Sequence, residues 1–268
     1  MTENKVKSWT DWGDSPNKDY PDAMLVVSEL MKQNFLRYRE VLSMIILDIV
    51  AGYKSALFGV VDSNNNILLA GVALFKEESS KSVSSILRAF FKIQKAKPRS
   101  ILTEGQKYIA EALKYLSDQN IFRGAHILSP MHILRKASLK FNGSTADRLS
   151  VMSSLTTLLD TRDKDEFHET VGLLLSNPVN KSLIEELTNE ENKSIFYCCT
   201  GKSFVGLTRA GCQKLHKLVR PHFREGAAFC DFFRKSVTLN VEITDNFWKS
   251  FNHYEVDTGL CEWDPRIS

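Results

Sequence analysis

The fold is limited above all by three apolar segments between residues 41 and 75. Val41–Val50 (VLSMIILDIV) is an almost continuous apolar run, which is typical of a strand buried on both faces of a sheet. Gly52 ends this run, and Lys54–Val61 and Ile67–Phe75 (ILLAGVALF) follow as two further strands. The sequence DSNNN at Asp62–Asn66 is a strong turn signal, so the last two strands are predicted to form a hairpin.

Helices and strands are predicted to alternate in the sequence that follows. The expected elements are a helix at Lys81–Lys95, a strand at Arg99–Thr103, a helix at Gln106–Leu116, a strand at Phe122–Leu128 and a helix at Pro130–Leu139. Three antiparallel strands followed by alternating parallel units are the layout of a ribonuclease-H-like α/β domain. The sequence therefore predicts a mixed sheet with helices on both faces.

The chain is predicted to have four parts. Residues 1–40 are interpreted as an N-terminal tail leading into an outlying helix at Ala23–Tyr38, and residues 41–142 as the ribonuclease-H-like core. Residues 143–238 are expected to be mainly helical and to complete this domain, and residues 239–268 to form a tail that mixes a strand with acidic residues. The elements expected after the core are helices at Ala146–Leu159, Asp163–Leu175, Pro178–Asn189, Leu207–Val219 and Glu225–Phe233, and a short strand at Ser194–Cys199.

The composition argues against export and membrane insertion. The sequence has no run of about 18 uncharged apolar residues, and its first residues are polar and acidic. The five cysteines are odd in number and confined to the last third of the chain, which does not fit a disulfide framework. We therefore expect an intracellular protein in a reducing compartment, nuclear if the source is eukaryotic, without a membrane partner.

Positive charge is concentrated in three stretches, although the net charge is only +3. Residues 79–100 hold six cations and no acid, residues 122–141 hold four cations and no acid, and residues 201–237 hold eight cations against two acids. Such surfaces attract phosphate backbones, so DNA is the expected partner. The alternative is that these are solvated helix faces whose acidic complement lies elsewhere in the fold. The residues predicted to contact DNA are Arg209, Lys214, Lys217 and Arg220.

Two acids occupy the places where ribonuclease-H-like nucleases and transposases hold metal. In those enzymes an aspartate on the first strand and an acid after the fourth bind two divalent cations, and a later helix supplies a third acid. Carboxylates are needed because Mg²⁺ prefers hard oxygen ligands. Asp48 and Glu104 stand at these two places, on strands that would be neighbours in such a sheet. They are the predicted catalytic and metal-binding residues.

The ordered series of motifs resembles the transposase domain of Mutator-like elements (MULE). The pieces that carry the resemblance are MIILDIVAGYKSALFGVVDSNNNILLAGVALFKEES, KPRSILTEGQKYIAEAL and GAHILSPMHILRKA, which together span about residues 41–140. The resemblance implies an ancestral activity of DNA cleavage and strand transfer, with Mg²⁺ as cofactor. It also implies that His132 stands in the family's Cys-x-x-His step.

Departures from the family pattern predict a degenerate active site. The family's second acid is aspartate, and Glu104 is one methylene longer. Ser129 replaces the cysteine of the Cys-x-x-His step, and Gly211 stands where the third acid would fall. Because a two-metal centre that loses a ligand holds its cations poorly, we expect impaired catalysis with residual DNA binding. An active Mg²⁺-dependent nuclease would need a substitute acid, for which the sequence offers Glu225, Asp231 and Glu186.

Other interpretations of these residues stay open. Asp48 is placed inside a buried strand, where an unpartnered carboxylate is costly and a ligand or partner is expected. Glu104 is equally explained by the positive end of the following helix, and His132 by a core position. Cys212 and His216 lie four residues apart on a helix, which is half of a zinc site. A non-catalytic protein-interaction module is the alternative function, and homo-oligomerisation stays open.

Overall fold

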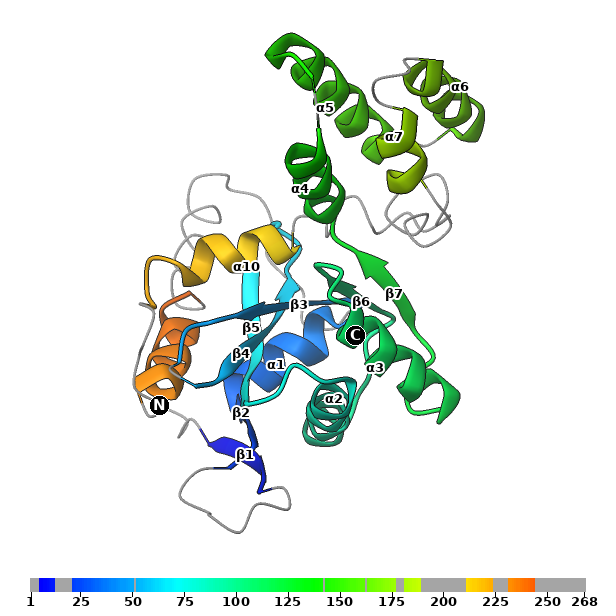
Figure 1. Ribbon diagram of the computed structural model, residues 1–268. Coiled ribbons are helices and arrows are strands. Elements are labelled where there is room, and N and C mark those ends of the chain that lie inside the picture. Colours follow the sequence, from blue (N-terminus) through cyan, green and yellow to red (C-terminus); the bar gives the residue numbers. More distant parts are fainter. Residues whose placement is uncertain are drawn as a thin grey trace, which may run out of the picture.

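The computed structural model describes residues 5–12, 21–50, 52–141, 143–161, 163–176, 181–188, 211–223 and 231–243. These residues form a mixed α/β structure around a seven-stranded sheet in the order β1-β2-β5-β4-β3-β6-β7 (Figure 1). The predicted α/β class with antiparallel and parallel strands is therefore confirmed. Within the described part of the chain, no helix is both long enough and apolar enough to cross a membrane.

The three apolar segments form the centre of the sheet. Strands β3 (Val41–Leu47), β4 (Lys54–Val61) and β5 (Ile67–Phe75) pair antiparallel, and every residue of β5 is buried. The predicted turn joins β4 to β5, where Asp62 Oδ1 accepts hydrogen bonds from the backbone amides of Asn64 at 2.9 Å and Asn66 at 2.7 Å. The antiparallel meander is confirmed.

The N-terminal segment belongs to the sheet, which corrects the predicted outlying helix. Residues 23–38 form a strand, β2 (Ala23–Ser28), followed by a helix, α1 (Glu29–Tyr38). Ser28 divides the two because its hydroxyl caps the helix, accepting from the Met31 amide at 3.2 Å. Strand β2 pairs antiparallel with β5, and β1 (Val6–Asp11) pairs with β2 at the edge. The apolar sequence AMLVVS is thus buried as a strand.

The predicted alternation follows on the other side of β3. Helix α2 (Ser80–Gln94) leads to β6 (Ser100–Thr103), and α3 (Lys107–Asp118) leads to β7 (Ala125–Leu128). Strand β6 pairs parallel with both β3 and β7. Phe90 of α2 stacks on Phe58 of β4 with ring centroids 4.7 Å apart, so α2 covers this face of the sheet.

Helix α10 (Gly211–Val219) covers the opposite face (Figure 1). A Cβ atom added at Gly59 would lie 2.6 Å from Leu215 Cδ2, so the helix lies directly on β4. Residues 231–243 form a further helix, which overturns the strand predicted after residue 238. The β-branched sequence is helical because the buried residues Phe232, Ser236 and Leu239 recur at helical spacing.

Among the described residues between β7 and α10, four helices form a separate helical unit (Figure 1). They are α4 (Pro130–Lys140), α5 (Thr145–Asp160), α6 (Lys164–Ser176) and α7 (Lys181–Leu187). The unit has its own apolar core, which includes Ala137, Leu155, Phe167 and Ile184. It therefore begins at α4, ahead of the boundary predicted after residue 142. The mainly helical character predicted for this region is confirmed for the described residues.

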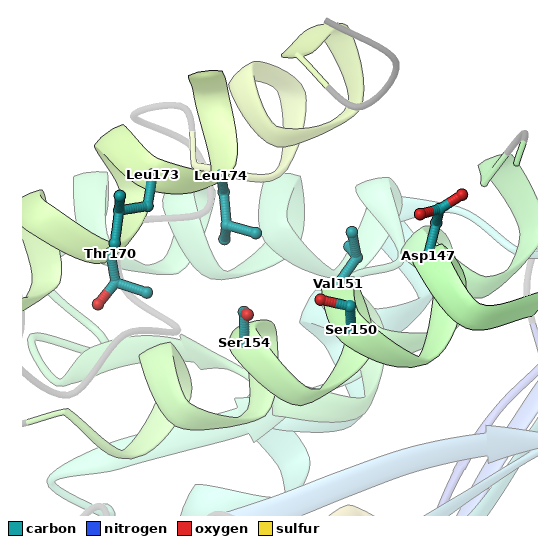
Figure 2. Close-up of a pocket in the computed structure, with 7 residues that line it drawn as sticks. All are labelled: Asp147, Ser150, Val151, Ser154, Thr170, Leu173 and Leu174. Atoms are coloured by element: carbon teal, nitrogen blue, oxygen red, sulfur yellow. The ribbon is translucent and has the colours of Figure 1, made fainter. Parts of the chain in front are cut away.

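A groove between α5 and α6 encloses about 260 Å³ (Figure 2). Its walls carry the hydroxyl groups of Ser150, Ser154 and Thr170, the carboxylate of Asp147 and the side chains of three aliphatic residues. No residue that lines the groove is among the predicted site residues.

Candidate functional site

The two predicted acids follow the carboxyl ends of neighbouring parallel strands. Strand β3 pairs with β6 in a register that sets Ser43 opposite Leu102. Continuing this register places Glu104 level with Ile45, and Asp48 lies three residues further along the chain, about 10 Å for extended backbone. Both acids therefore lie at one edge of the sheet, as the sequence analysis predicts. Their carboxylates bind different partners.

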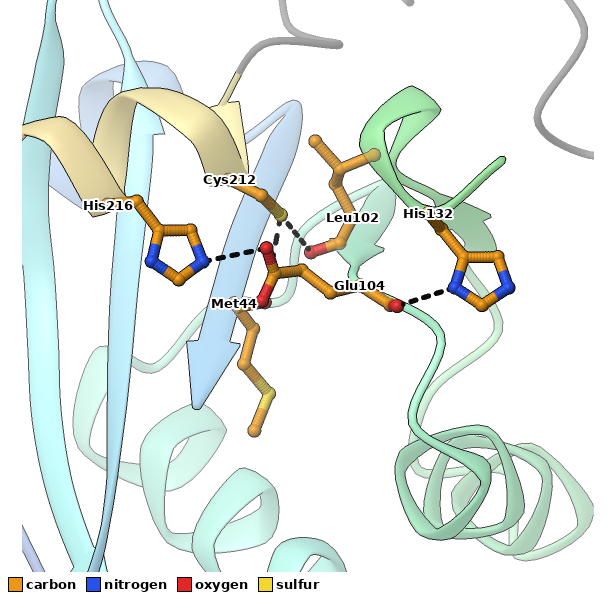
Figure 3. Close-up of polar contacts among 6 residues, drawn as sticks. All are labelled: Met44, Leu102, Glu104, His132, Cys212 and His216. Atoms are coloured by element: carbon orange, nitrogen blue, oxygen red, sulfur yellow. Dashed lines mark hydrogen bonds and ion pairs between the residues drawn. The ribbon is translucent and has the colours of Figure 1, made fainter. Parts of the chain in front are cut away.

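The carboxylate of Glu104 is held by a histidine from α10 (Figure 3). Its Oε1 atom lies 2.7 Å from His216 Nε2, and the two side chains are 24% and 22% exposed. Because a carboxylate accepts, His216 donates from Nε2. The other ring nitrogen, Nδ1, is buried and has no hydrogen-bond partner in the described structure. This Glu104–His216 pair joins the end of β6 to α10.

A second histidine fixes the turn after β6 (Figure 3). His132 Nδ1 donates to the backbone carbonyl of Glu104 at 2.9 Å. Gly105 has a φ of +87°, and a Cβ atom there would lie 2.6 Å from His132 Nδ1, so only glycine fits between them. Burial lowers the pKa of His132. The neutral ring therefore acts as a structural clamp on the segment that carries Glu104.

Cys212 lies at the seam between β3 and β6, where its thiol contacts both strands. Its Sγ lies 3.5 Å from the Leu102 carbonyl oxygen and 3.7 Å from that of Met44. Burial raises the pKa of the thiol, so Cys212 stays protonated and donates to the two strands. Among the described residues, no three or more His, Cys, Asp or Glu side chains are grouped to hold a metal ion.

Gly211 leaves no room for a third acid at its position. A Cβ atom built on Gly211 would lie 1.9 Å from Ser43 Oγ, because the first turn of α10 touches β3 directly. Any side chain here would push the helix away from the sheet. The close contact explains in physical terms why glycine stands where the resemblance to Mutator-like transposases implies an acid.

Asp48 is exposed, which corrects its predicted place inside a buried strand. Strand β3 ends at Leu47, and the Asp48 side chain is 73% exposed. Its carboxylate lies 2.7 Å from Lys54 Nζ, which also lies 2.8 Å from the carboxylate of Glu78. The hydrogen bonds that Lys54 donates to these two acids raise its pKa above the usual value. The lysine ammonium thus occupies the place of a cation between two carboxylates.

A tyrosine on α3 belongs to the same neighbourhood. Burial, together with the negative charges of Glu78 and Asp48, raises the pKa of Tyr108 to about 12 against the opposing effect of Lys54. Tyr108 therefore stays a neutral phenol at physiological pH. As a neutral phenol, Tyr108 does not act as a general base near the two acids.

The two substitute acids that the structure describes, Glu186 and Asp231, are paired with other cations. Glu186, in α7, lies 2.9 Å from Lys136 and 2.8 Å from Lys140, both in α4. Those lysines lower the pKa of Glu186 to about 2. Asp231 lies 3.5 Å from Arg234 on the same helix, and Glu225 lies outside the described residues.

The predicted DNA contacts divide into three cases. Lys214 donates from Nζ to the backbone carbonyl of Asn65 in the β4–β5 turn, and burial lowers its pKa. Lys217, on α10, and Arg220, directly after it, are exposed. Arg209 lies outside the described residues. Lys217 and Arg220 therefore remain as candidates that project into solvent.

Sequence reasoning missed the two basic partners of the acids. His216 was considered only as half of a zinc site, and Lys54 only as the first residue of a predicted strand. The β3–β4 register pairs Leu47 with Ser55 and so sets Asp48 opposite Lys54. The positions where the apolar segments of the two strands end and begin could therefore have predicted this pair. No local pattern links Glu104 to His216, which is 112 residues away.

Comparison of the sequence with protein-family models and with curated proteins finds no match in either case.

Proposed function

We propose that this chain is a transposase-derived domain of the ribonuclease-H-like type, similar to the transposases of Mutator-like elements, that binds DNA and has lost DNA cleavage. The observation that carries the proposal is the position of Asp48 and Glu104 after the carboxyl ends of β3 and β6. These are adjacent parallel strands at the centre of a mixed sheet.

The strand order supports the ribonuclease-H-like assignment. Strand β3 has the antiparallel strands β4 and β5 on one side and the parallel strands β6 and β7 on the other. This is the arrangement expected of three antiparallel strands followed by alternating parallel units. Helix α10 then returns to the ends of β3 and β6 after the helical unit, in the place where a third acid would be needed. Strands β1 and β2 are an addition beyond β5.

The loss of cleavage rests on how the two acids are bound. Lys54 neutralises Asp48, His216 holds Glu104, and Gly211 has no space for a side chain. A divalent cation would have to displace an ammonium group or an imidazole before it met two carboxylates. The residues present therefore do not fit a two-metal centre.

DNA binding rests on the exposed cations at the end of α10. Lys217 and Arg220 lie about one helical turn apart on the solvent side, where they can reach phosphate oxygens. Contacts of this kind release counterions, so the affinity falls steeply as salt rises. Glu104 and His216 support this function by anchoring α10 on the sheet.

The experiment is a titration of the chain with a duplex of about 30 base pairs, followed by fluorescence anisotropy at several salt concentrations. We expect the double variant Lys217→Gln/Arg220→Gln to bind more weakly and with a lower salt slope, by about 0.9 for each phosphate that the protein no longer neutralises. Lys164→Gln/Lys181→Gln, which removes the same charge from the helical unit, is the matched control. Equal binding by the two variants contradicts the proposal.

A cleavage assay tests the other half of the proposal. Wild type and Asp48→Ala are incubated with supercoiled and linear DNA in Mg²⁺ or Mn²⁺. We expect no difference between them. If wild type cleaves DNA and Asp48→Ala does not, the chain is an active nuclease and the proposed loss of cleavage is wrong.

A protein-interaction module is the second candidate function, and the exposed leucines of the helical unit favour it. Leu139, Leu149 and Leu173 are 77%, 67% and 68% exposed, and Leu173 lines the groove between α5 and α6. Exposed apolar side chains gathered on one unit are typical of a surface that binds another protein. DNA binding that is absent or insensitive to salt would favour this candidate.

A further inference from the structure

The outer face of α2 carries a straight row of cations. Lys81, Arg88 and Lys92 are all exposed, and their spacing places them within about 40° of one another around the helix. The row is about 17 Å long at the usual rise of a helix. Lys95 is also exposed and directly follows the helix.

This row lacks the acidic partners that neighbouring cations have. Lys54 binds Asp48, Arg99 lies 3.1 Å from Glu40, and Lys107 lies 3.9 Å from Glu111. The cations of the row form no ion pair with any described residue, and residues 79–100 contain no acid. No described acid therefore lies within ion-pair distance of these three cations.

Helix stability does not account for the row. A cation near the carboxyl end of a helix is favourable, which suits Lys92 in the last turn. Lys81 lies in the first turn, where the positive end of the helix dipole disfavours a cation and where α2 itself has no acid. Glu77 and Glu78 directly precede the N-cap, and Glu78 is paired with Lys54 at 2.8 Å. The position of Lys81 points to an external negative charge.

The middle cation of the row is held in place by an aromatic ring. The guanidinium of Arg88 lies 5.2 Å from the ring centroid of Tyr115, which projects from α3 and is 48% exposed. This contact restricts the side chain and leaves its N–H groups directed at solvent or a ligand. A pre-positioned guanidinium loses less entropy when it binds a phosphate.

We propose that this face of α2 is a DNA-binding surface of its own, which binds the phosphate backbone of duplex DNA without reading sequence. The three cations of the row can neutralise up to three phosphates. Phe90 of α2 packs on one face of the sheet and Leu215 of α10 on the other, so the row lies on the side of the molecule away from α10 (Figure 1).

The chemistry of α2 favours nucleic acid over a lipid surface. Helices that bind membranes place apolar side chains next to their cations, where they enter the lipid. The apolar residues of α2, including Val83, Leu87 and Phe90, are buried in the core of the protein. The exposed side of the helix therefore offers charge alone.

The test compares the triple variant Lys81→Gln/Arg88→Gln/Lys92→Gln with a control triple variant, Lys7→Gln/Lys164→Gln/Lys181→Gln. All six residues are exposed, and each set lowers the net charge by the same amount, so only position differs. Binding to a duplex of about 30 base pairs is measured by anisotropy across salt concentrations. We expect the α2 variant to bind at least a hundredfold more weakly at about 0.1 M salt, with a salt slope lower by about 2.7. The control changes both by much less.

The outcomes separate this surface from the one on α10. Equal effects of the α2 and control variants overturn the proposal, even if Lys217→Gln/Arg220→Gln still weakens binding and the proposed function stands. Weakening by the α2 variant alone supports the α2 surface and removes the role of α10. Two further results overturn the α2 proposal. One is α2-dependent binding of wild type to phosphatidylserine vesicles without binding to DNA. The other is tighter binding to duplex RNA than to duplex DNA.

Discussion

Glu104 and His216 are joined by a hydrogen bond of 2.7 Å between Oε1 and Nε2, although 112 residues separate them in the sequence. The bond ties α10 to the carboxyl end of β6. It also occupies the carboxylate that a metal site would need. One contact thus fastens the helix and closes the candidate site.

Removal of the imidazole is expected to loosen α10. His216→Ala leaves the half-buried Glu104 carboxylate without its donor and should lower the free energy of unfolding by about 1–2 kcal/mol. His216→Gln keeps an N–H donor and should cost less. Urea denaturation measures both, with the exposed His168→Ala as the control. Equal stability of His216→Ala and His168→Ala would show that the bond contributes nothing.

The contact between Gly211 and Ser43 predicts a rescue. Gly211→Ala places a methyl group 1.9 Å from Ser43 Oγ and should destabilise the chain by about 1–3 kcal/mol. In a Ser43→Gly background the obstacle is gone, so the same substitution should cost much less. A double-mutant cycle measured by denaturant unfolding gives the coupling between the two positions. An additive result contradicts the close packing of α10 on β3.

Lys54 is expected to exclude divalent cations from Asp48 and Glu78. Lys54→Gln removes the ammonium and leaves two carboxylates without a cation, so Mn²⁺ affinity should rise at least tenfold by calorimetry. Lys76→Gln, which removes a lysine that lies 3.1 Å from Asp22, is the control. Because Asp48 is exposed, we expect the stability to change by less than about 1 kcal/mol. Unchanged Mn²⁺ affinity would show that the lysine does not guard the two acids.

The same lysine gives a stability contribution that depends on pH at the alkaline end. The pKa of Lys54 is raised above its ordinary value of 10.5 in the folded chain. The contribution of its ion pairs is therefore complete below pH 10.5 and is lost as the pH rises above that value. Wild type and Lys54→Gln should differ in stability by the same amount at about pH 7 and about pH 9, measured by urea denaturation.

His126 is expected to limit stability in acid. Burial lowers its pKa from 6.5 to about 4, so protonation favours the unfolded chain. Stability is complete above pH 6.5 and is lost as the pH falls toward 4, by up to about 3 kcal/mol. His126→Gln should flatten this part of the pH profile while keeping a partner for Thr103, which lies 2.8 Å from His126 Nε2. A profile as steep as that of wild type would assign the loss to other groups.

The strands of the sheet could be predicted from the sequence wherever burial on both faces makes every residue of the segment apolar. β5 is buried along its whole length, so its sequence is apolar at every position and is recognised as a strand. β2 was missed because its short apolar sequence runs directly into α1, and apolar residues at helical spacing continue across the Ser28 cap. The helix at 231–243 was predicted only as far as Phe233, because the β-branched residues that follow favour a strand locally, whereas packing decides for a helix.

The positions of the acids could be predicted, but their partners could not. Strand order alone brings Asp48 and Glu104 to one edge. The Lys54 contact depends on where β3 ends, which sequence reasoning placed three residues too late. The His216 contact depends on how α10 docks on the sheet after the helical unit. Tertiary packing of this kind leaves no periodic pattern in the sequence.

The insertion of α4–α7 between β7 and α10 has a consequence for how the protein folds. Cys212 contacts Met44 across a separation of 168 residues, and Asn240 contacts Asn34 across 206. Contacts this distant close large loops, which slows folding. We expect the β3–β5 meander to form early and the docking of α10 to be the late step. A nascent chain that has not yet been synthesised as far as residue 211 would therefore expose the β3–β6 seam. We expect this seam to be the surface that chaperones bind first.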